Sequence, residues 1–396
     1  MRTWGITGTN GKTTTTWILA AFLEADKSRR AGYITTVEAF DGKSRFYTGY
    51  TTPPRERLEE IYAAMRANGC TDCVMEVSSH AIHQDRVGFG KTTTFDGGAF
   101  TNLSEDHLDY HKTMEEYFRV KLSFAERIAE GGLRARGWES GPPPSAGRRD
   151  FPVYVVCLDG GYGDEMLAAC GKLPLNVVPV TCRSPRYDLS GLRLIGDYNR
   201  SNVLVAAALA EAAGVSPKAI QRTIPTLLPR WGRLERVENP DVPAEVYVDF
   251  AHTPDGLEKM LAAVRGDMKR RGLGGSLWVV FGAGGDRDPM KRPLMGAACA
   301  RLADRLVVTS DNPRSEDPLA IIRGVTSGID GAANVSVEPD REAAISLALS
   351  NAAAGDVVVV AGKGHETTQE IAGVKHPFDD RAIVRAFHCR KPSVLL

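Results

Sequence analysis

The sequence predicts an α/β protein with two domains in series: a P-loop domain with a mainly parallel sheet over residues 1–237, then a Rossmann-like α/β domain over residues 238–396. Short β-rich runs alternate with helical patterns along most of the chain, which is typical of a parallel sheet covered by helices on both faces. A glycine-containing loop joins the first such run to the first helical pattern. A second alternating block follows residues 237–245, which contain two prolines, lack an apolar period and indicate a linker.

In the first domain the alternation starts at the N-terminus. The predicted strands are 4–7, 73–79 and 153–159, and the predicted helices are 12–25, 56–67 and 202–215. Gly214 helps to end the last of these helices. Residues 137–151 are rich in proline and glycine, so they indicate a loop or a disordered excursion.

The second domain repeats this alternation. Its predicted strands are 245–250, 276–282, 305–310 and 356–362, and its predicted helices are at about 255–271, 292–303, 318–328 and 341–353. Open α/β sheets bind ligands at the carboxyl ends of their strands. We therefore expect any site that the two domains share to lie at their facing strand ends.

Composition narrows the classes of protein to consider. The chain has 396 residues, of which 43% are hydrophobic, enough for two or three domains with substantial cores. Lys+Arg and Asp+Glu balance at 49 each, so the net charge gives no sign of a nucleic-acid or anionic-membrane partner. No apolar run reaches the roughly 18 residues of a membrane span, and the N-terminus lacks the apolar core of a signal peptide. We expect a soluble cytoplasmic protein.

The glycine-containing loop has the composition of a phosphate-binding loop. Its residues are Gly8, Thr9, Asn10, Gly11, Lys12, Thr13 and Thr14. Glycines let backbone N–H groups close around phosphate oxygens, and the N-terminus of the following helix adds partial positive charge. Lys12 is expected to neutralise the β- and γ-phosphates of ATP, and a hydroxyl of Thr13 or Thr14 to hold Mg²⁺. The alternative is a mere connector, because Ile6 stands where the usual P-loop pattern has glycine.

Eight sequence blocks, in order along the chain, resemble one enzyme family. The first, GITGTNGKTTT, is similar to the ATP loop of the Mur ligases and folylpolyglutamate synthetases. The others are GYTTPP (49–54), MEVSSHAIHQDRV (75–87), AFTNLSEDHLDYHKTMEEYFRVK (99–121), VDFAHTPDGLEK (248–259), FGAGGDRDPMKRP (281–293), DNPRSEDP (311–318) and AGKGHETTQ (361–369). Together they resemble the UDP-N-acetylmuramyl-tripeptide synthetases, the Mur ligases that add the third peptide residue. The resemblance extends from residue 5 to about residue 380.

The resemblance implies a metal site beside the ATP phosphates. Glu76 and His107 match family residues that serve Mg²⁺, with Thr13 as a further ligand; a satisfied core histidine is the alternative for His107. Lys121 matches the family lysine that takes up CO₂ and becomes a carbamate. That change supplies an anionic metal ligand and requires a neutral amine, which burial favours. With Lys12, these residues form the implied catalytic set; for Lys121 the alternative is an exposed helical lysine.

The resemblance also assigns residues to the acceptor and to the nucleotide. The implied acceptor residues are Thr51, Thr52, Ser78, Gln84 and Arg86. Their hydroxyl, amide and guanidinium groups suit a substrate that carries carboxylates and amides. The implied nucleotide residues, beyond the phosphate loop, are Asn199, Asn202, Arg233, Asp249 and His252. Polar caps and turns are the alternative for a single residue such as Thr51.

The segment DNPRSEDP (311–318) predicts amino-acid specificity. It follows a predicted strand, so its polar side chains lie at that strand's carboxyl end. A guanidinium fork suits a carboxylate, and a carboxylate suits an ammonium group. In the resembled family this segment and its matching partners mark enzymes for meso-diaminopimelate rather than lysine: Arg287, Asp311, Asn312, Arg314, Gly362 and Glu366. A local Asn-Pro turn is compatible with such a pocket.

The resemblance implies an ATP-dependent ligase that forms ADP and an acyl phosphate of the acceptor, which the amino acid's amine then attacks. Family members carry an N-terminal UDP-binding domain, whereas four residues precede Gly5 here. We therefore expect that domain to be absent and the carboxylate acceptor to lack a UDP handle. The alternatives are a genuine UDP-N-acetylmuramoyl-dipeptide ligase with a partner protein that supplies the domain, an enzyme of peptide natural-product assembly, and a ligase like folylpolyglutamate synthetase.

Two other classes of P-loop protein fit the sequence less well. A switch or motor needs no amino-acid pocket such as DNPRSEDP predicts. A non-catalytic nucleotide-binding module predicts loss of the metal and lysine positions, which are all present.

Overall fold

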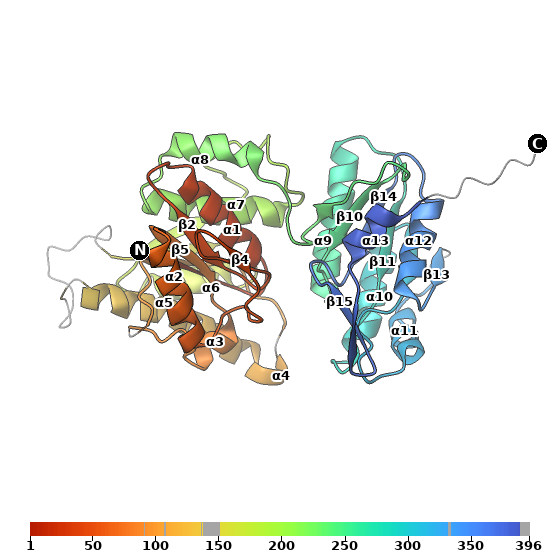
Figure 1. The fold of residues 1–396 in the computed structure, drawn as a ribbon, viewed down its shortest axis with the longest axis horizontal. Helices are drawn as coiled ribbons and strands as arrows, with labels where there is room; N and C mark the ends of the chain where they lie inside the picture. The colour runs from red at the N-terminus through yellow and green to blue at the C-terminus, as the bar shows by residue number, and fades with distance from the viewer. Residues whose placement is uncertain (91, 107, 136, 138–150, 332–333, 389–396) are drawn as a thin grey trace, which may run out of the picture. The chain divides into compact units, whose positions relative to one another are not determined.

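The computed structural model of the chain describes residues 1–90, 92–106, 108–135, 137, 151–331 and 334–388. The chain forms two compact units, Met1–Arg193 with Asp197–Leu227 and Leu194–Gly196 with Leu228–Leu396 (Figure 1). Most of the loop predicted at 137–151 lies outside the described residues. In the part that is described, no helix has the length and apolarity needed to cross a membrane.

The first unit is built on an eight-stranded sheet in the order β4-β3-β2-β5-β1-β6-β7-β8. The strands are β1 (Arg2–Thr7), β2 (Ala31–Ile34), β3 (Ala39–Phe40), β4 (Arg45–Phe46), β5 (Asp72–Glu76), β6 (Gly97–Phe100), β7 (Val153–Cys157) and β8 (Asn176–Val180). In the sheet, the neighbouring strands β2, β5, β1, β6, β7 and β8 are all parallel. Strands β3 and β4 add an antiparallel edge beside β2. The parallel strands therefore end at one edge of the sheet.

Helices cover both faces of this sheet. They are α1 (Lys12–Glu24), α2 (Arg55–Ala67), α3 (Ser79–His83), α4 (Leu108–His111), α5 (Met114–Ala135), α6 (Gly163–Cys170), α7 (Asp197–Ala212) and α8 (Pro217–Thr223), which a 3₁₀ turn (Ile224–Thr226) follows. Helices α1 and α7 pack against each other and the sheet, whereas α2, α3, α5 and α6 share the hydrophobic cluster of the other face (Figure 1). The buried positions of α5 include Tyr117, Lys121, Phe124 and Ile128, whose spacing places them on one face of a helix. Lys121 thus occupies a core position.

The second unit has a six-stranded sheet in the order β13-β12-β11-β14-β10-β9. The strands are β9 (Glu235–Arg236), β10 (Glu245–Asp249), β11 (Leu277–Phe281), β12 (Arg305–Val308), β13 (Val335–Val337) and β14 (Val357–Ala361). All are parallel except β9. The central strand β14 is apolar on both faces: Val357 and Val359 pack into one cluster, and Val358 and Val360 into the other.

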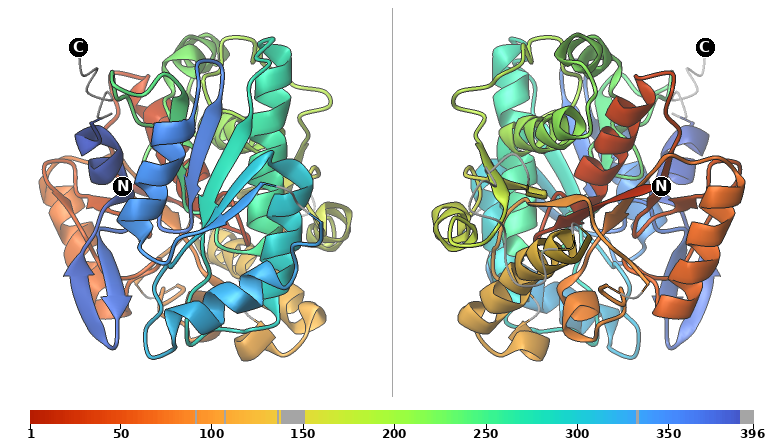
Figure 2. Two further views of the ribbon diagram at one scale, coloured as in Figure 1. Left: turned by 90° about the vertical axis from the view of Figure 1, so that its right-hand side faces the viewer. Right: turned by 90° about the vertical axis from the view of Figure 1, so that its left-hand side faces the viewer.

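The helices of the second unit also cover both faces. They are α9 (Pro254–Arg270), α10 (Lys291–Leu302), α11 (Pro318–Thr326), α12 (Arg341–Asn351) and α13 (Asp380–Ala386). Helices α9, α10 and α11 share one hydrophobic cluster, and α12 and α13 share the other. A separate hairpin, β15 (Thr368–Ile371) and β16 (Val374–Pro377), stands apart from this sheet (Figure 2).

The predicted α/β class is confirmed, and each strand and helix named from the sequence is present with its ends shifted by a few residues. Residues 237–245 had the composition of a linker, but they connect β9 to β10 inside the second unit. The sequence carries no sign of β9, because that strand is only two residues long and has no recognisable pattern. Strand β6 was not predicted, since its two glycines have low β-propensity. These glycines are needed for packing: a Cβ at Gly98 would collide with Ile128 of α5.

Replacement of Phe124 by Ala is expected to lower the free energy of unfolding of the first unit by about 3–5 kcal/mol. The Phe124 side chain is fully buried and its ring is perpendicular to that of Phe95, with centroids 5.1 Å apart. Chemical denaturation of the full chain measures the effect. Arg119→Ala on the same helix is the control; its side chain is 74% exposed and its loss should change the stability by less than about 1 kcal/mol. Equal effects of the two substitutions would contradict the packing described.

Candidate active site

The phosphate loop connects β1 to α1 at the carboxyl edge of the first sheet. Gly11 is the N-cap of α1 and has a left-handed backbone, with φ at 86°. A glycine cap has no side chain to accept hydrogen bonds, so the N–H groups of the first helical turn point toward the loop and can bind an anion. A Cβ at Gly11 would collide with the side-chain oxygen of Asn202, so only glycine fits.

Residues that follow β6 hold this loop in place. The backbone N–H of Thr9 donates to the carbonyl of Asn102 over 2.9 Å, and that of Asn10 donates to the Asn102 side chain over 3.0 Å. The Thr101 hydroxyl donates to the Asn10 carbonyl over 2.6 Å. The loop is therefore preorganised by its neighbouring strand.

The Nζ atoms of two lysines meet at the carbonyl of Gly8. Lys12 Nζ donates to Gly8 over 2.9 Å and to the Thr9 carbonyl over 2.8 Å, and Lys121 Nζ donates to Gly8 over 3.0 Å. The side chain of Lys121 is 1% exposed and its Nζ lies 4.6 Å from the centre of the Tyr117 ring. Burial, together with the Lys12 ammonium, lowers the pKa of Lys121 well below its usual value.

Glu76 ends β5 at the same edge and is buried. Its carboxylate accepts hydrogen bonds from the backbone N–H and the hydroxyl of Thr36, over 2.9 and 3.2 Å. Thr13, in the first turn of α1, is also buried. His107 lies outside the described residues, and the described part holds no group of three metal-binding side chains. A complete metal site therefore stays a prediction.

The predicted acceptor residues form two hydrogen-bonded groups near the end of β5. The Thr52 hydroxyl donates to the Glu76 carbonyl over 2.9 Å and accepts the backbone N–H of Ser78, which caps α3. The Thr51 hydroxyl oxygen lies 3.0 Å from the hydroxyl oxygen of Thr36, the partner of Glu76. In the second group, Arg86 donates to Gln84 over 2.7 Å and Gln84 to the Tyr110 hydroxyl over 3.1 Å.

The residues predicted to lie near the adenine are on α7. Asn199 and Asn202 are both buried, and the Asn202 amide donates to the Asn199 side chain over 3.2 Å. Because Asn202 also accepts from Thr15 of α1, it links α7 to the helix that carries the phosphate loop. Its position beside Gly11 explains the tight approach of the two helices.

In the second unit, a buried network joins the loops after β12 and β14. Lys363 Nζ, fully buried, donates to the side-chain oxygen of Asn312 over 3.1 Å and to the Glu366 carboxylate over 2.9 Å. The Asn312 amide donates to Glu366 over 3.0 Å. Although burial opposes it, the Lys363 ammonium holds the pKa of Glu366 below its usual value. Both predicted substrate residues, Asn312 and Glu366, are thus fixed by Lys363, which the sequence prediction missed inside the block AGKGHETTQ.

Asp311 and Gly362 lie against each other at the base of this network. The Asp311 side chain is buried, and burial raises its pKa, although the Arg341 and Lys363 cations oppose the rise. Gly362 has φ at 116°, and a Cβ there would collide with the Asp311 carboxylate. The glycine therefore makes room for Asp311, which is consistent with the pairing of these positions in the predicted pocket.

Arg314 lies on the same loop as Asp311, with φ at 52°, a left-handed conformation that is rare for a residue with a side chain. Its backbone N–H donates to the carbonyl of Glu370 over 3.0 Å, so the hairpin β15–β16 holds it there. Its guanidinium donates to the carbonyl of Gly285, two residues before the exposed Arg287. Both predicted substrate arginines, Arg287 and Arg314, therefore lie beside the loop at Gly284 and Gly285.

The remaining predicted nucleotide residues lie at the end of β10. The buried Asp249 carboxylate accepts the backbone N–H groups of Leu234 and Ala251, over 2.7 and 2.8 Å. The guanidinium of Arg233 lies 4.7 Å from the centre of the Phe250 ring. His252 is exposed and bonds to the Phe250 carbonyl. In these contacts Asp249 acts as a structural anchor, so its predicted role toward the ribose stays a prediction.

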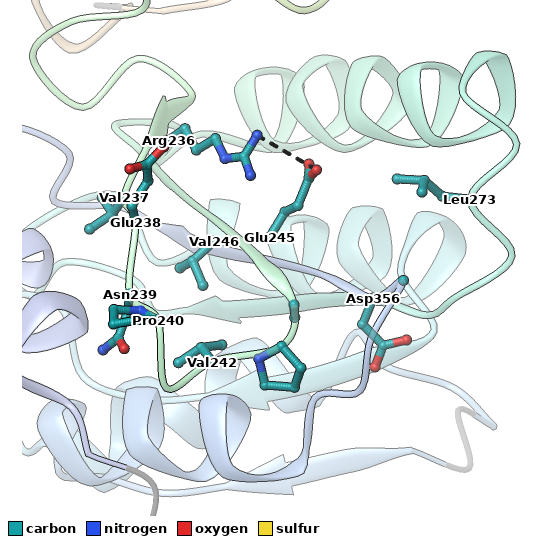
Figure 3. A pocket seen from close by; sticks show the side chains of 13 residues that line it. Arg236, Val237, Glu238, Asn239, Pro240, Val242, Glu245, Val246, Leu273 and Asp356 are labelled. Atoms are coloured by element: carbon teal, nitrogen blue, oxygen red, sulfur yellow. Dashed lines mark ion pairs between the residues drawn. The ribbon is translucent and has the colours of Figure 1, made fainter.

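A cavity of about 450 Å³ lies at the opposite edge of this sheet, where β10 and β14 begin (Figure 3). Glu245, which lines the cavity, forms ion pairs with Arg236 at 3.7 Å and with Arg271. None of the predicted site residues lines it. Since open α/β sheets bind ligands at the carboxyl edge, we do not assign a substrate to this cavity.

Comparison with known proteins places both units in one family. Residues 6–135 match the Mur ligase middle domain, and residues 232–364 match the glutamate ligase domain of Mur ligases. The chain is 41% identical over 397 residues to the UDP-N-acetylmuramoyl-L-alanyl-D-glutamate–2,6-diaminopimelate ligase of Synechococcus elongatus, covering 96% of this chain and 75% of that protein. It is 42% identical over 382 residues to the Chromobacterium violaceum protein of the same name, covering 95% and 75%. The chain belongs to the Mur ligase family.

Solved structures agree with this assignment of the Mur ligase family. A structure of a UDP-N-acetylmuramoyl-L-alanyl-D-glutamate–2,6-diaminopimelate ligase matches 97% of this chain and 77% of that chain, with a TM-score of 0.61 and 31% identity. Mycobacterium tuberculosis folylpolyglutamate synthase matches 91% of this chain and 88% of that chain with a TM-score of 0.61, but at 19% identity this match shows the fold alone. This Mur ligase is therefore an ATP-dependent enzyme that forms amide bonds and releases ADP.

Replacement of Gly11 by Ala is expected to weaken ADP binding by about tenfold or more, because the new Cβ collides with Asn202 and displaces the loop N–H groups. Calorimetric titration with ADP measures the effect. Gly69→Ala is the matched control: Gly69 also has a positive φ, at 78°, but no atom lies within 4 Å of the place that its Cβ would take. That change should cost about 1 kcal/mol of stability and leave ADP affinity unchanged. Unaltered ADP binding in the Gly11 variant would refute the assigned role.

Proposed function

We propose that this Mur ligase joins an amino acid of the diaminopimelate type to a peptide carboxylate through an acyl-phosphate intermediate. The observation that carries the proposal is the network of Asn312, Lys363 and Glu366 beside Arg314, which places anionic and cationic groups on adjoining loops. A substrate with ammonium and carboxylate groups at one end fits that arrangement. The names of the relatives point to the same amino acid.

The first step is transfer of the γ-phosphoryl group. An oxygen of the acceptor carboxylate attacks the γ-phosphorus of ATP, the bond between that phosphorus and the β,γ-bridging oxygen breaks, and ADP leaves. Lys12 and the N–H groups at the start of α1 stabilise the charge that develops on the phosphate oxygens. In the ligand-free protein Lys12 is bonded to loop carbonyls, and we propose that it moves to the phosphates when ATP binds.

The buried oxygen donors of Thr13 and Glu76 suit a hard ion such as Mg²⁺. Thr13, Glu76, His107 and the carbamate of Lys121 would hold the ion, which supplies charge neutralisation for the phosphates. A neutral, buried amine is the form of lysine that reacts with CO₂, and the environment of Lys121 favours that form.

The second step is amide formation. The amine nitrogen attacks the acyl carbonyl carbon, the bond from that carbon to the phosphate oxygen breaks, inorganic phosphate leaves, and the nitrogen loses a proton. Asp311 and Glu366 would bind the second ammonium group of the amino acid, and Arg287 and Arg314 its distal carboxylate. The carboxylates and the arginines would thus bind groups of opposite charge at the far end of the amino acid. These contacts would orient the reacting amine and exclude shorter amino acids.

The acceptor would lie along the end of β5. We propose that Thr51, Thr52 and Ser78 contact its amide groups and that Gln84 and Arg86 bind a carboxylate. The Arg86 guanidinium already donates a hydrogen bond to the Gln84 side chain over 2.7 Å, and this bond orients the guanidinium. Whether the acceptor carries a UDP group is tested by a direct comparison of substrates.

The decisive assay measures ADP release by the full chain with ATP, one amino acid and one acceptor. UDP-N-acetylmuramoyl-dipeptide is compared with the same dipeptide lacking UDP, and meso-diaminopimelate with lysine. The proposal expects ADP release that requires both the acceptor and diaminopimelate, with the amide product identified by mass. ADP release that is independent of any amino acid would overturn it.

Replacement of Lys121 by Ala is expected to lower kcat by about a hundredfold or more, since an anionic group beside the phosphates is lost. Short carboxylates such as formate should partly restore activity. Arg119→Ala on the same helix, an exposed cation, should leave kcat unchanged. Because the pKa of Lys121 is lowered, its carbamate should form at lower pH than that of an exposed lysine, as carbon NMR with isotope-labelled bicarbonate can measure. Full activity without Lys121 would exclude the carbamate.

Replacement of Arg314 by Met is expected to raise KM for diaminopimelate by about tenfold or more, through the loss of a charge-assisted bond to its distal carboxylate. Lysine lacks that carboxylate, so the selectivity ratio between the two amino acids should fall. Steady-state kinetics with both amino acids measure this ratio. Arg323→Met is the control, since that side chain is 69% exposed on α11. An unchanged ratio would argue against Arg314 as the selective residue.

A further inference from the structure

Arg341, the first residue of α12, is a buried cation that the predicted site does not include. Its side chain is 1% exposed. The guanidinium binds the Asp380 carboxylate at the start of α13 through two hydrogen bonds, from Nε over 2.9 Å and from Nη2 over 2.8 Å. It also donates from Nη1 to the Ser310 carbonyl over 3.3 Å and from Nη2 to the Ala361 carbonyl over 2.9 Å.

The two carbonyls connect Arg341 to the amino-acid pocket. Ser310 lies just after β12 and directly precedes Asp311; Ala361 ends β14 and directly precedes Gly362. One rigid, planar group therefore spans the loops that carry two predicted substrate residues. A flexible or apolar side chain at this position could not hold both carbonyls at once.

Stability alone does not account for the buried pair of Arg341 and Asp380. A buried ion pair generally adds little stability over an apolar pair of similar volume, because both charges must be desolvated. An apolar pair supplies no hydrogen-bond donor for the carbonyls of Ser310 and Ala361. The contribution that only Arg341 can make is thus the position of these two strand ends.

Arg341 also lies close to the Asp311 carboxylate. A Cβ built at Gly362 would touch that carboxylate and would lie 3.9 Å from Arg341 Nη2. The guanidinium favours the ionised form of Asp311 against the effect of burial on its pKa. The ionised carboxylate is the form that binds an ammonium group.

We propose that Arg341 is a positioning residue for the amino-acid substrate: it holds the loops after β12 and β14 so that Asp311 and Gly362 face one ammonium group. This inference rests on the proposed function, because it concerns the same pocket. It predicts an effect on amino-acid binding that is separate from the effect on stability.

The experiment compares Arg341→Met with the double variant Arg341→Met/Asp380→Leu in the full chain. The single variant leaves the Asp380 charge buried and should lower Tm. The double variant should recover Tm, because the unpaired charge is gone, but its KM for diaminopimelate should stay raised by about tenfold, with KM for ATP within about twofold of the original enzyme. Arg385→Met on α13, an exposed arginine, should change none of these values.

The outcomes separate the inference from its rivals. A double variant with recovered Tm and the original KM for diaminopimelate would overturn it, since Arg341 would then be structural only. If neither Met variant folds, Arg341→Lys decides, because it keeps the positive charge but lacks the planar guanidinium. An unchanged KM for diaminopimelate in this variant counts against positioning, and a raised KM supports it. Calorimetric titration of diaminopimelate distinguishes this result from failure of the proposed function, in which the original enzyme itself binds no diaminopimelate.

Discussion

A buried nitrogen donor requires hydrogen-bond acceptors, and buried lysine and arginine side chains meet that requirement in both units of this Mur ligase. Lys121, Lys363 and Arg341 are all buried, and each donates to groups that lie at or just after the ends of strands. The acceptors are carbonyls of Gly8 and Ala361 and side chains such as Asn312. Loops that would otherwise be free to move are thereby bonded to the interior of their unit.

Parallel pairing makes such an arrangement possible. Because neighbouring strands run in one direction, the loops after β1, β2, β5 and β6 emerge at one edge of the first sheet. Thr36, Glu76 and Asn102 come from three of these loops or strand ends, yet they contact one another or the phosphate loop. In the second unit the ends of β12 and β14 converge in the same way around Lys363. The apolar strands supply the rigidity that these polar contacts require.

The sequence predicted the parts of this structure that have local signals. Alternating patterns indicated the α/β class, and the glycines with Lys12 indicated the phosphate loop. Arg341 escaped prediction because its partner Asp380 is 39 residues away in the chain. Lys363 has one near partner, Glu366, but its other partner, Asn312, is 51 residues away. A buried lysine or arginine looks like an exposed one in sequence until its partners are known. Strand β6 was missed for a local reason. Its glycines have low β-propensity, but the close packing around Gly98 favours them in this strand.

The two buried lysines differ in what their surroundings allow. Lys363 has a carboxylate partner, Glu366, at 2.9 Å, so its charge is compensated within the pocket. Lys121 Nζ donates to the Gly8 carbonyl and lies near the Tyr117 ring. Burial and the Lys12 charge lower the pKa of Lys121, and the charge of Asp106 opposes that effect. The lowered pKa favours the neutral amine at Lys121. Since CO₂ reacts only with the neutral amine, these surroundings favour the proposed carbamate at Lys121, whereas Lys363 is bound to a carboxylate.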